Sequence, residues 1–317
     1  MLDVHTKIAA VTPLEGSVVV VGSANADLTV RVAEMPHPGQ TIHGGPLVTL
    51  PGGKSANQAA AAALLGSPTA FVGAVGVDDN GDFLLASLGA CGVDTSNLHR
   101  VKAATSCAII TVDAHGENMI VVTDGANNQV DGAILGSART ALTSAKAVGL
   151  ALEIPVEAVV SAAKTAHEAG AIVVFNPSPM PSSLPQELLA NTDVLVVNEG
   201  EMRDMIGDVA GDWGLAEERL SALGVGSAVV TIGPRGSVVL ADGATLVPVV
   251  DVDVVDTTGC GDSFTGALMA ALASGRDLLA SAQFASIVAS YASMGFGAQA
   301  SYGTLEQIRT AFDGSHG

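Results

Sequence analysis

The feature that most constrains the fold is the alternation of short apolar runs with helical segments in the second half of the chain. The runs are nearly continuous Val, Ile, Leu and Ala, as in strands that are buried on both faces. From residue 131 on, the predicted order is helix, strand 147–152, helix 156–169, strand 171–176, helix, strand 194–198, helix, strand 228–232. This order predicts an α/β fold with a doubly wound, mainly parallel sheet that is covered by helices.

The first part of the chain contains two kinds of predicted strand. One kind continues the α/β pattern, with strands at 17–21 and 69–75 and helices at 56–65 and 81–91. The other kind mixes apolar and polar residues beside turns, as half-exposed strands do, and occurs at 28–32, 41–50, 106–113 and 118–122. We expect these four strands to form a small β-sheet lid, from about 28–50 and 101–123. The lid would cover the carboxyl edge of the main sheet, where ligands bind in open α/β sheets.

Charge excludes two classes of partner. The chain has 13 Lys and Arg against 32 Asp and Glu, a net charge of −19. Nucleic-acid binders and membrane-surface proteins need clustered cations, so neither partner is expected. Any phosphate group must then be held mainly by backbone amides, helix N-termini and a metal ion.

The cysteines and the N-terminal segment bear on the compartment. Cys91, Cys107 and Cys260 are scattered and odd in number, which argues against a disulfide framework or a structural zinc site. Residues 1–16 lack the apolar run of a signal peptide, and no stretch is long and apolar enough to span a bilayer. We expect a cytoplasmic protein with a flexible tail at 1–16 and one domain at 17–317.

Three segments are candidates for phosphate-binding loops. GKS at 53–55 resembles the end of a P-loop, but Val48 stands where that motif requires Gly. The GxGxxA pattern at 295–300 has no βαβ unit after it, which disfavours a dinucleotide site. DTTGCGDSFTG at 256–266 instead runs from a strand-like VDVDVV segment at 250–255 into an apolar helix at 267–273. Its glycines allow consecutive amides to face a pocket at a helix N-terminus, where a phosphoryl group would bind.

Asp262 in this last segment has two interpretations. Asp is a preferred N-cap of helices, which would be a purely structural role. A carboxylate beside a phosphate-binding turn can also act as a base toward a hydroxyl that approaches the phosphoryl group. The second interpretation predicts a kinase.

These motifs resemble the PfkB-type, ribokinase-like family of sugar kinases. DTTGCGDSFTG is similar to the C-terminal signature of that family, and PGGKSANQAAAAALLG at 51–66 is similar to the N-terminal signature. Further segments fall in the order and spacing of the ribokinase branch, namely GSANADL at 22–28, GEN at 116–118, LEIP at 152–155, NPSP at 176–179, NEGE at 198–201, TIGPRG at 231–236 and FGAQAS at 296–301. The resemblance covers nearly the whole chain. It implies a three-layer ribokinase-like fold and ATP-dependent phosphorylation of D-ribose at its 5-hydroxyl.

The resemblance also implies roles for individual residues. Asp262 would be the catalytic base, and the amides of Gly259, Cys260 and Gly261 would form an anion hole. Cys260 stands where the family usually has Ala, and Ser263 where Thr is common, but both side chains are small. The sugar site would comprise Asn25, Asp27, Gly53, Lys54, Asn57, Glu153 and Asp262. Taken alone, Asn25 and Asp27 could equally be turn residues, and Lys54 a solvated side chain.

For the nucleotide and the ions, the resemblance implies two further groups. Asn198 and Glu201 would organise Mg²⁺ and phosphates through water, and Thr231, Gly233 and Gly236 would contact the nucleotide. We interpret Arg235 in the same loop as a solvated side chain. A monovalent cation, K⁺, would bind at Asp256, Thr258, Ala292, Gly295, Gly297 and Ser301. Without the resemblance, Asp256 is more simply a turn cap and Ser301 a helix start.

The lid bears on the substrate and on assembly. Residues 28–50 and 101–122 contain no Phe, Tyr or Trp that could stack on a base, which disfavours a nucleoside kinase. The alternatives to ribose are therefore another pentose or hexose, fructose or a keto-deoxy sugar. A non-catalytic sugar-binding protein is disfavoured because Asp262, Gly259 and Gly261 are all present, and a dehydrogenase because GSANAD replaces the glycine-rich turn. We expect a homodimer through the lid, whose strand edges and apolar faces need cover.

Overall fold

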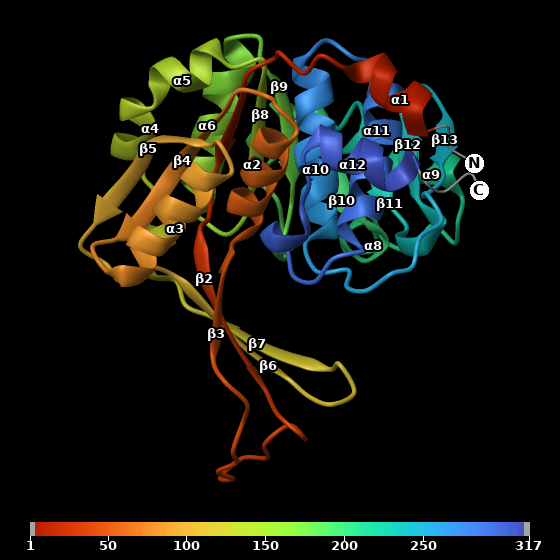
Figure 1. Ribbon diagram of the computed structural model, residues 1–317. Coiled ribbons are helices and arrows are strands. Elements are labelled where there is room, and N and C mark those ends of the chain that lie inside the picture. Colours follow the sequence, from red (N-terminus) through yellow and green to blue (C-terminus); the bar gives the residue numbers. More distant parts are fainter. Residues whose placement is uncertain (1–3, 314–317) are drawn as a thin grey trace.

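The computed structural model describes residues 4–313, and its centre is a broad sheet with helices on both faces (Figure 1). Over these residues the sheet has nine strands in the order β13-β12-β11-β10-β9-β8-β1-β4-β5. The parallel strands are β1 (Val18–Val21), β4 (Thr69–Gly76), β5 (Asp94–Val101), β8 (Ala147–Ala151), β9 (Ile172–Asn176), β10 (Val194–Asn198) and β11 (Ala228–Thr231). The antiparallel strands are β12 (Ser237–Leu240) and β13 (Ala244–Val247). The predicted mainly parallel sheet is confirmed.

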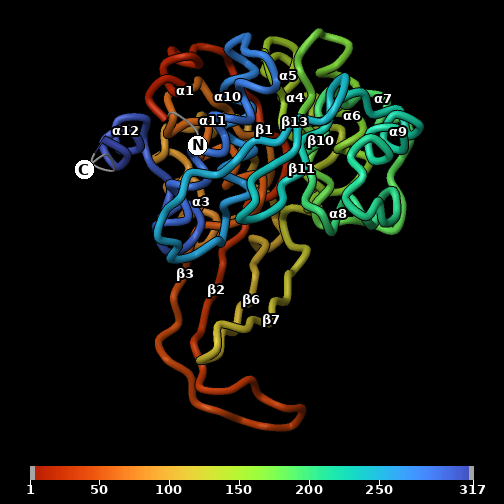
Figure 2. Tube along the Cα trace, turned by 90° about the vertical axis from the view of Figure 1, so that its right-hand side faces the viewer, coloured from red at the N-terminus to blue at the C-terminus, as the bar shows by residue number. Residues whose placement is uncertain are grey.

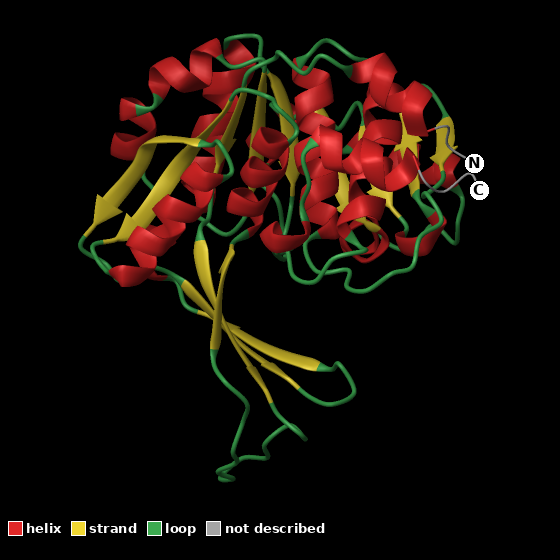
Figure 3. Ribbon diagram, in the orientation of Figure 1, coloured by secondary structure: helices red, strands yellow, loops and turns green. Residues whose placement is uncertain are grey.

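Helices form a layer on each face of this sheet (Figure 3). One layer contains α1 (Val4–Val11), α2 (Lys54–Leu64), α3 (Asp79–Ala90), α10 (Cys260–Ala273), α11 (Leu278–Ala292) and α12 (Leu305–Asp313). The other contains α4 (Gly132–Ser137), α5 (Arg139–Ser144), α6 (Val156–Glu168), α7 (Gln186–Ala190), α8 (Glu199–Ile206) and α9 (Trp213–Ala222). Short 3₁₀ helices are η1 (Gly125–Gln129), η2 (Gly233–Arg235) and η3 (Gln299–Ser301).

The apolar runs of the strands follow from this layering. Val18 and Val20 of β1 pack into the core under α2 and α10, whereas Val19 and Val21 pack into the opposite core. Both faces of each central strand are thus buried, and alternation with polar residues is absent. Small residues let α2 and α10 approach closely, because a Cβ on Gly266 would lie 2.5 Å from the carbonyl oxygen of Gln58.

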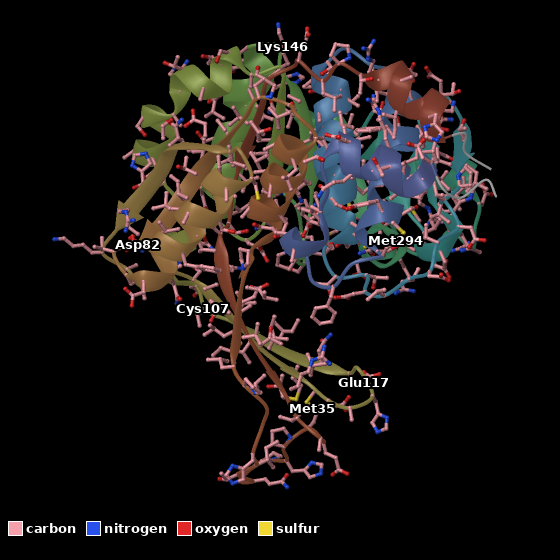
Figure 4. The ribbon with its side chains drawn as sticks, viewed as in Figure 1. Met35, Asp82, Cys107, Glu117, Lys146 and Met294 are labelled. Carbon is pink, nitrogen blue, oxygen red and sulfur yellow. The ribbon has the colours of Figure 1, made fainter. Side chains whose placement is uncertain are left out.

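A second, smaller sheet forms the lid. Among the described residues it has the strand order β3-β2-β6-β7, from β2 (Asn25–Arg31), β3 (Val48–Gly52), β6 (Cys107–Val112) and β7 (Asn118–Val122). It extends from the carboxyl edge of the main sheet and stands away from the body in both views (Figures 1 and 2). Cys107 lies near the base of the lid, while Met35 and Glu117 lie toward its free end (Figure 4). The predicted small β-sheet is confirmed.

Some expectations for single segments are wrong. The strand expected at 41–50 begins only at Val48, because Pro46 has no amide to donate to the ladder, although the Gly45 amide still donates to the carbonyl of Arg31 at 2.8 Å. The VDVDVV segment at 250–255 is not a strand. Pro248 separates it from β13, and the backbone of the segment pairs with no neighbouring strand in the described part of the chain.

The N-terminal segment also differs from expectation. A flexible tail was expected at 1–16, but helix α1 packs on α11 and buries Ile8 and Val11 completely. The Arg276 guanidinium donates to the carbonyl of Val11 at 3.2 Å and ties this helix to the body. Within residues 4–313, no helix is long and apolar enough to cross a membrane.

Candidate active site

The predicted sugar-binding residues come together at the carboxyl edge of the main sheet, where the lid begins. Glu153 follows β8, and its Oε2 accepts hydrogen bonds from the Lys54 amide at 3.0 Å and from the Ser23 hydroxyl. These bonds join the first turn of α2 to the segment between β1 and β2. Asp27 projects from β2 beside Gly52, where a Cβ would lie 2.1 Å from its Oδ2. Small residues therefore make room for the carboxylate.

Gly53 has a backbone reason for its identity. Its φ is +90°, a conformation that L side chains rarely adopt, and a Cβ there would lie 2.8 Å from the carbonyl oxygen of Ser23. Only glycine therefore lets α2 begin against the β1–β2 connection. The start of α2 at this point brings Lys54 and Asn57 to the carboxyl edge, with Lys54 near Asp262 and Asn57 in contact with it.

Asn25 is held by Asn127, a residue outside the predicted sugar site. Asn25 is buried, and its Oδ1 accepts from the Asn127 Nδ2 at 2.7 Å. The Asn127 Oδ1 in turn accepts from the backbone amide of Ala24 at 3.1 Å, and the backbone amide of Asn127 donates to the Ser106 hydroxyl at 3.0 Å. Asn127 lies in η1, immediately after the last lid strand, so it links the base of the lid to Asn25.

Asp262 lies in the first turn of α10, and both of its oxygens accept from amide side chains of α2. Asn57 Nδ2 donates to Oδ2 at 2.9 Å, and Gln58 Nε2 makes a longer contact of 3.4 Å to Oδ1. Gly259 is the N-cap of α10, and Asp262 does not cap the helix. The structural interpretation of Asp262 as an N-cap is therefore wrong.

Three carboxyl groups from different elements influence one another in this pocket. Burial, and after it the charges of Glu153 and Asp262, raise the pKa of Asp27 to about 7. Burial also raises the pKa of Asp262 to about 6, against the opposing effect of the nearby Lys54 ammonium. With a pKa of about 6, Asp262 is mostly ionised at neutral pH and can still accept a proton, as a general base must.

The turn before Asp262 offers backbone donors. Gly259 has φ +74°, and a Cβ there would lie 2.6 Å from the Cβ of Ala298. The backbone amide of Cys260 donates to the carbonyl of Thr257 at 3.2 Å, whereas the amides of Gly259 and Gly261 have no acceptor within the described chain. A Cβ on Gly261 would project into open space. The turn therefore presents the amides of Gly259 and Gly261, and the expected contribution of Cys260 is already used within the turn.

Cys260 is not a reactive thiol in this setting. Burial, with the carboxylates of Asp256 and Asp262, raises its pKa to about 11. The thiol therefore remains protonated near neutral pH, and this protonation weakens its nucleophilic character.

The predicted nucleotide residues lie at the ends of β10 and β11. Asn198 and Thr231 are direct neighbours across these two strands. Asn198 and Glu201 form a capping box at the start of α8, with bonds of 2.8 and 2.9 Å. Gly233 has φ +60° and faces open space, whereas a Cβ on Gly236 would lie 2.0 Å from a backbone oxygen of β13. The structure thus brings the group together and gives Gly236 a packing role.

Arg235 in the same loop forms an exposed ion pair of 2.5 Å with Glu199. Such exposed pairs contribute little to stability. This agrees with the interpretation of Arg235 as a solvated side chain.

The predicted monovalent-cation residues also converge, on two loops that flank the turn. The Asp256 carboxylate accepts from the amides of Gly297 and Thr258, both at 2.9 Å, and from the Thr258 hydroxyl at 2.8 Å. Gly295 packs against Ser301, and its amide donates to the carbonyl of Ala292 at 3.2 Å. Burial alone would raise the pKa of Asp256, but these hydrogen bonds outweigh it and lower the pKa. The Asp256 carboxylate is thus held ionised by two backbone amides and one hydroxyl that donate to it.

Comparison with known proteins identifies the class. The profile of the pfkB family carbohydrate kinases matches residues 15–305, and the chain belongs to this family. Among its relatives, the ribokinase of Staphylococcus aureus is 33% identical over 302 residues, which cover 93% of this chain and 99% of that protein. The ribokinase of Bacillus subtilis is 35% identical and covers 92% and 98% of the two chains.

Solved structures agree with this assignment. The structure of Arabidopsis thaliana ribokinase complexed with ribose and ATP superposes with a TM-score of 0.88 at 32% identity, covering 93% of this chain and 98% of that one. The ribokinase of Thermotoga maritima superposes with a TM-score of 0.85 at 30% identity, covering 94% and 99%. The ribokinase-like three-layer fold is confirmed.

Proposed function

We propose that this protein is an ATP-dependent ribokinase that transfers the γ-phosphoryl group of ATP to the 5-hydroxyl of D-ribose. The observation that carries the proposal is the position of Asp262, which follows the glycine turn directly and lies close enough to Asp27, Glu153 and Lys54 for their charges to act on one another. The names of the relatives support ribose as the sugar, and one neighbour was solved with ribose and ATP bound.

In the proposed reaction, Asp262 acts as the general base. Its carboxylate takes the proton of the sugar hydroxyl while the oxygen forms a bond to the γ-phosphorus and the bond to ADP breaks. Asn57 and Gln58 hold both carboxylate oxygens, so the base is fixed before the sugar arrives. The amides of Gly259 and Gly261 stabilise the charge that develops on the phosphoryl oxygens. Lys54 adds a positive charge close to Asp262.

The sugar pocket suits a polyol. Carboxylates such as Asp27 can accept from two adjacent hydroxyls, and the buried Asn25 is held in one orientation by Asn127. One oxygen of Glu153 is occupied by the Lys54 amide and the Ser23 hydroxyl, which orients the other oxygen. We infer that these residues recognise the hydroxyls of ribose.

Two ions complete the proposal. Mg²⁺ would be held at Asn198 and Glu201 through water, because their side chains already serve the capping box of α8. When bound, it would neutralise charge on the phosphates. K⁺ would bind at Asp256, Thr258, Ala292, Gly295, Gly297 and Ser301, where the ionised Asp256 supplies the negative charge. The chain's scarcity of Lys and Arg makes such ions the available cations.

We also infer a homodimer through the lid. Strand β7 lies at the edge of the lid sheet, and its residues Met119, Ile120, Val121 and Val122 are all more than half exposed. Because both faces and the edge of this strand are open, a second copy of the lid is the partner that would cover them. Ile120→Lys should convert a dimer to a monomer in sedimentation equilibrium. A monomeric wild type at micromolar concentration would contradict the inference.

The test of function is a panel of sugars and nucleosides assayed for ADP release, with and without K⁺. We expect ribose to give the highest kcat/KM and K⁺ to stimulate turnover. Much faster turnover of another sugar would overturn the ribose assignment. Equal rates with K⁺ and with a large organic cation would overturn the cation assignment.

A further inference from the structure

A chain of buried amide side chains connects the loop after α11 to the proposed base. Gln299 Nε2 donates to the Oδ1 of Asn57 at 3.0 Å, and Asn57 Nδ2 donates to the Oδ2 of Asp262 at 2.9 Å. Gln299 is 7% exposed and Asn57 6%, so water competes little for either bond. Gln299 belongs to the GxGxxA pattern at 295–300, which does not form a dinucleotide site.

The direction of this chain is set by its last member. An ionised Asp262 can only accept, so Asn57 must turn its NH₂ group toward it and its carbonyl oxygen toward Gln299. Gln299 must then present its own NH₂ group. A residue of the same size that cannot donate at position 299 would leave the Asn57 carbonyl unpaired or turn the Asn57 amide around. In the reversed orientation, the Asn57 carbonyl would face the carboxylate of Asp262.

The same loop braces the glycine turn in two other places. The Gly297 amide donates to Asp256 at 2.9 Å, and the Tyr302 hydroxyl donates to the carbonyl of Gly259 at 2.8 Å. Gln299 lies between these two contacts in the sequence. The loop therefore reaches the backbone of the turn through Gly297 and Tyr302, and the side chain of the base through Gln299.

On the far side of the base, a second amide chain is longer and weaker. Asn176 donates its Nδ2 to the Val196 carbonyl at 2.8 Å, and its Oδ1 accepts from Gln58 at 3.5 Å. Gln58 then contacts Asp262 at 3.4 Å. Bonds near 2.9 Å are much stronger than contacts at these lengths, so the arm through Gln299 and Asn57 dominates.

We propose that Gln299 is a positioning residue for phosphoryl transfer, which holds the Asn57 amide in the one orientation that orders Asp262. This inference rests on the proposed function of Asp262 as the base. Gln299 does not touch the substrate in this role. It acts through Asn57, so its effect belongs to the chemical step and depends on the presence of the Asn57 amide.

A double-mutant cycle tests this dependence. Gln299→Met keeps the size of the side chain and removes the donor, and it should lower kcat about 10-fold, with the KM for ATP changed less than about 2-fold. In an Asn57→Ala background, the same substitution should lower kcat by less than about 2-fold, because the residue through which Gln299 acts is gone. An equal loss in both backgrounds would overturn the proposal.

A second comparison does not need the Asn57→Ala background. Gln299→Glu is nearly isosteric but accepts where Gln donates, so it should reverse the Asn57 amide and lower kcat about 10-fold more than Gln299→Met. The acid limb of its kcat profile should move to higher pH. Asp262 is also faced by Asp27 on β2, Glu153 after β8, Lys54 on α2, Cys260 on α10 and Tyr302 after η3, and these groups are unchanged in both variants. Equal activity of the two variants, with unmoved pH profiles, would contradict the proposal.

Controls separate this inference from folding and from the function itself. Gln186→Met removes a similar donor, which bonds to the Leu223 carbonyl far from the site, and it should change kcat less than about 2-fold. Thermal unfolding of every variant identifies a loss that comes from folding. Wild-type protein that fails to phosphorylate any sugar would refute the proposed function, whereas an active wild type with no coupling between Gln299 and Asn57 would refute only this inference.

Discussion

Replacement of Asp27 by Asn gives a quantitative test of the electrostatics of the sugar pocket. Burial, followed by the carboxylates of Glu153 and Asp262, raises the pKa of Asp27 from 3.8 to about 7. The folded state therefore binds the proton more tightly than the unfolded state. Between these two pKa values, the free energy of unfolding falls as the pH rises, and the full penalty is present above about pH 7.

The size of the effect follows from the shift. One pKa unit corresponds to about 1.4 kcal/mol, so the ionised Asp27 lowers the free energy of unfolding by up to about 4 kcal/mol. Asp27→Asn removes the charge at nearly constant shape. The variant should be more stable than wild type by up to about 4 kcal/mol at about pH 8, and by less than about 2 kcal/mol at about pH 5. For a chain of this length, the larger value corresponds to a rise in Tm of about 6 °C.

Thermal unfolding at the two pH values measures this difference directly. Asp204→Asn, on the exposed surface of α8, serves as the matched control and should change Tm equally at both pH values. The same Asp27→Asn protein should bind ribose more weakly, because stability gained in a binding pocket is commonly offset by lost function. A variant no more stable than wild type at pH 8, or equally stabilised at both pH values, would refute this reasoning.

Three other predictions concern the backbone, the lid base and the thiol. Gly53→Ala should lower the free energy of unfolding by more than about 2 kcal/mol, whereas Gly66→Ala, which has a similar φ but open space around it, should lower it by about 1 kcal/mol in urea titrations; equal losses would contradict the close approach at Gly53. Asn127→Ala should raise the KM for ribose about 10-fold and leave the KM for ATP nearly unchanged, since it frees the Asn25 amide; a change in the ATP value alone would argue against this role. Because the pKa of Cys260 is about 11, the kinase should keep its activity in iodoacetamide at neutral pH, and rapid inactivation that Cys260→Ala abolishes would contradict the buried, protonated thiol.

Local patterns were sufficient where an element's environment is uniform. Strand β1 is buried on both faces, so its run of valines predicted it directly. Helix α2 was predicted from its alanines, which its close packing on α10 requires. Expectations failed where a partner distant in sequence decides the outcome. Helix α1 is short and has few helix signals of its own, and it is stabilised by packing on α11. The 250–255 segment alternates like a strand but finds no neighbour to pair with in the described chain.

The candidate site shows the same division. The roles of Asp27, Glu153 and Asp262 were predicted from the family resemblance, and all three lie near the carboxyl edge, in the first residues of β2, just after β8 and in the first turn of α10. The amides that orient them were not predicted. Asn127 and Gln299 are 102 and 242 residues from their partners Asn25 and Asn57. Gln299 lies within the FGAQAS segment at 296–301, but the sequence does not show that its side chain reaches Asn57. Gln58 also contacts Asp262, and its place next to the predicted Asn57 is the one sequence feature that could have indicated this contact.

The central claim, that Asp262 is the base of an ATP-dependent sugar kinase, is tested most directly by the rate of ribose phosphorylation in Asp262→Asn. The substitution keeps the shape of the side chain and removes its ability to take a proton. We expect kcat to fall by about 10³-fold or more, while the dissociation constants of ribose and ATP change by less than about 3-fold in calorimetry. A variant that retains kcat within about 10-fold of wild type would contradict the account.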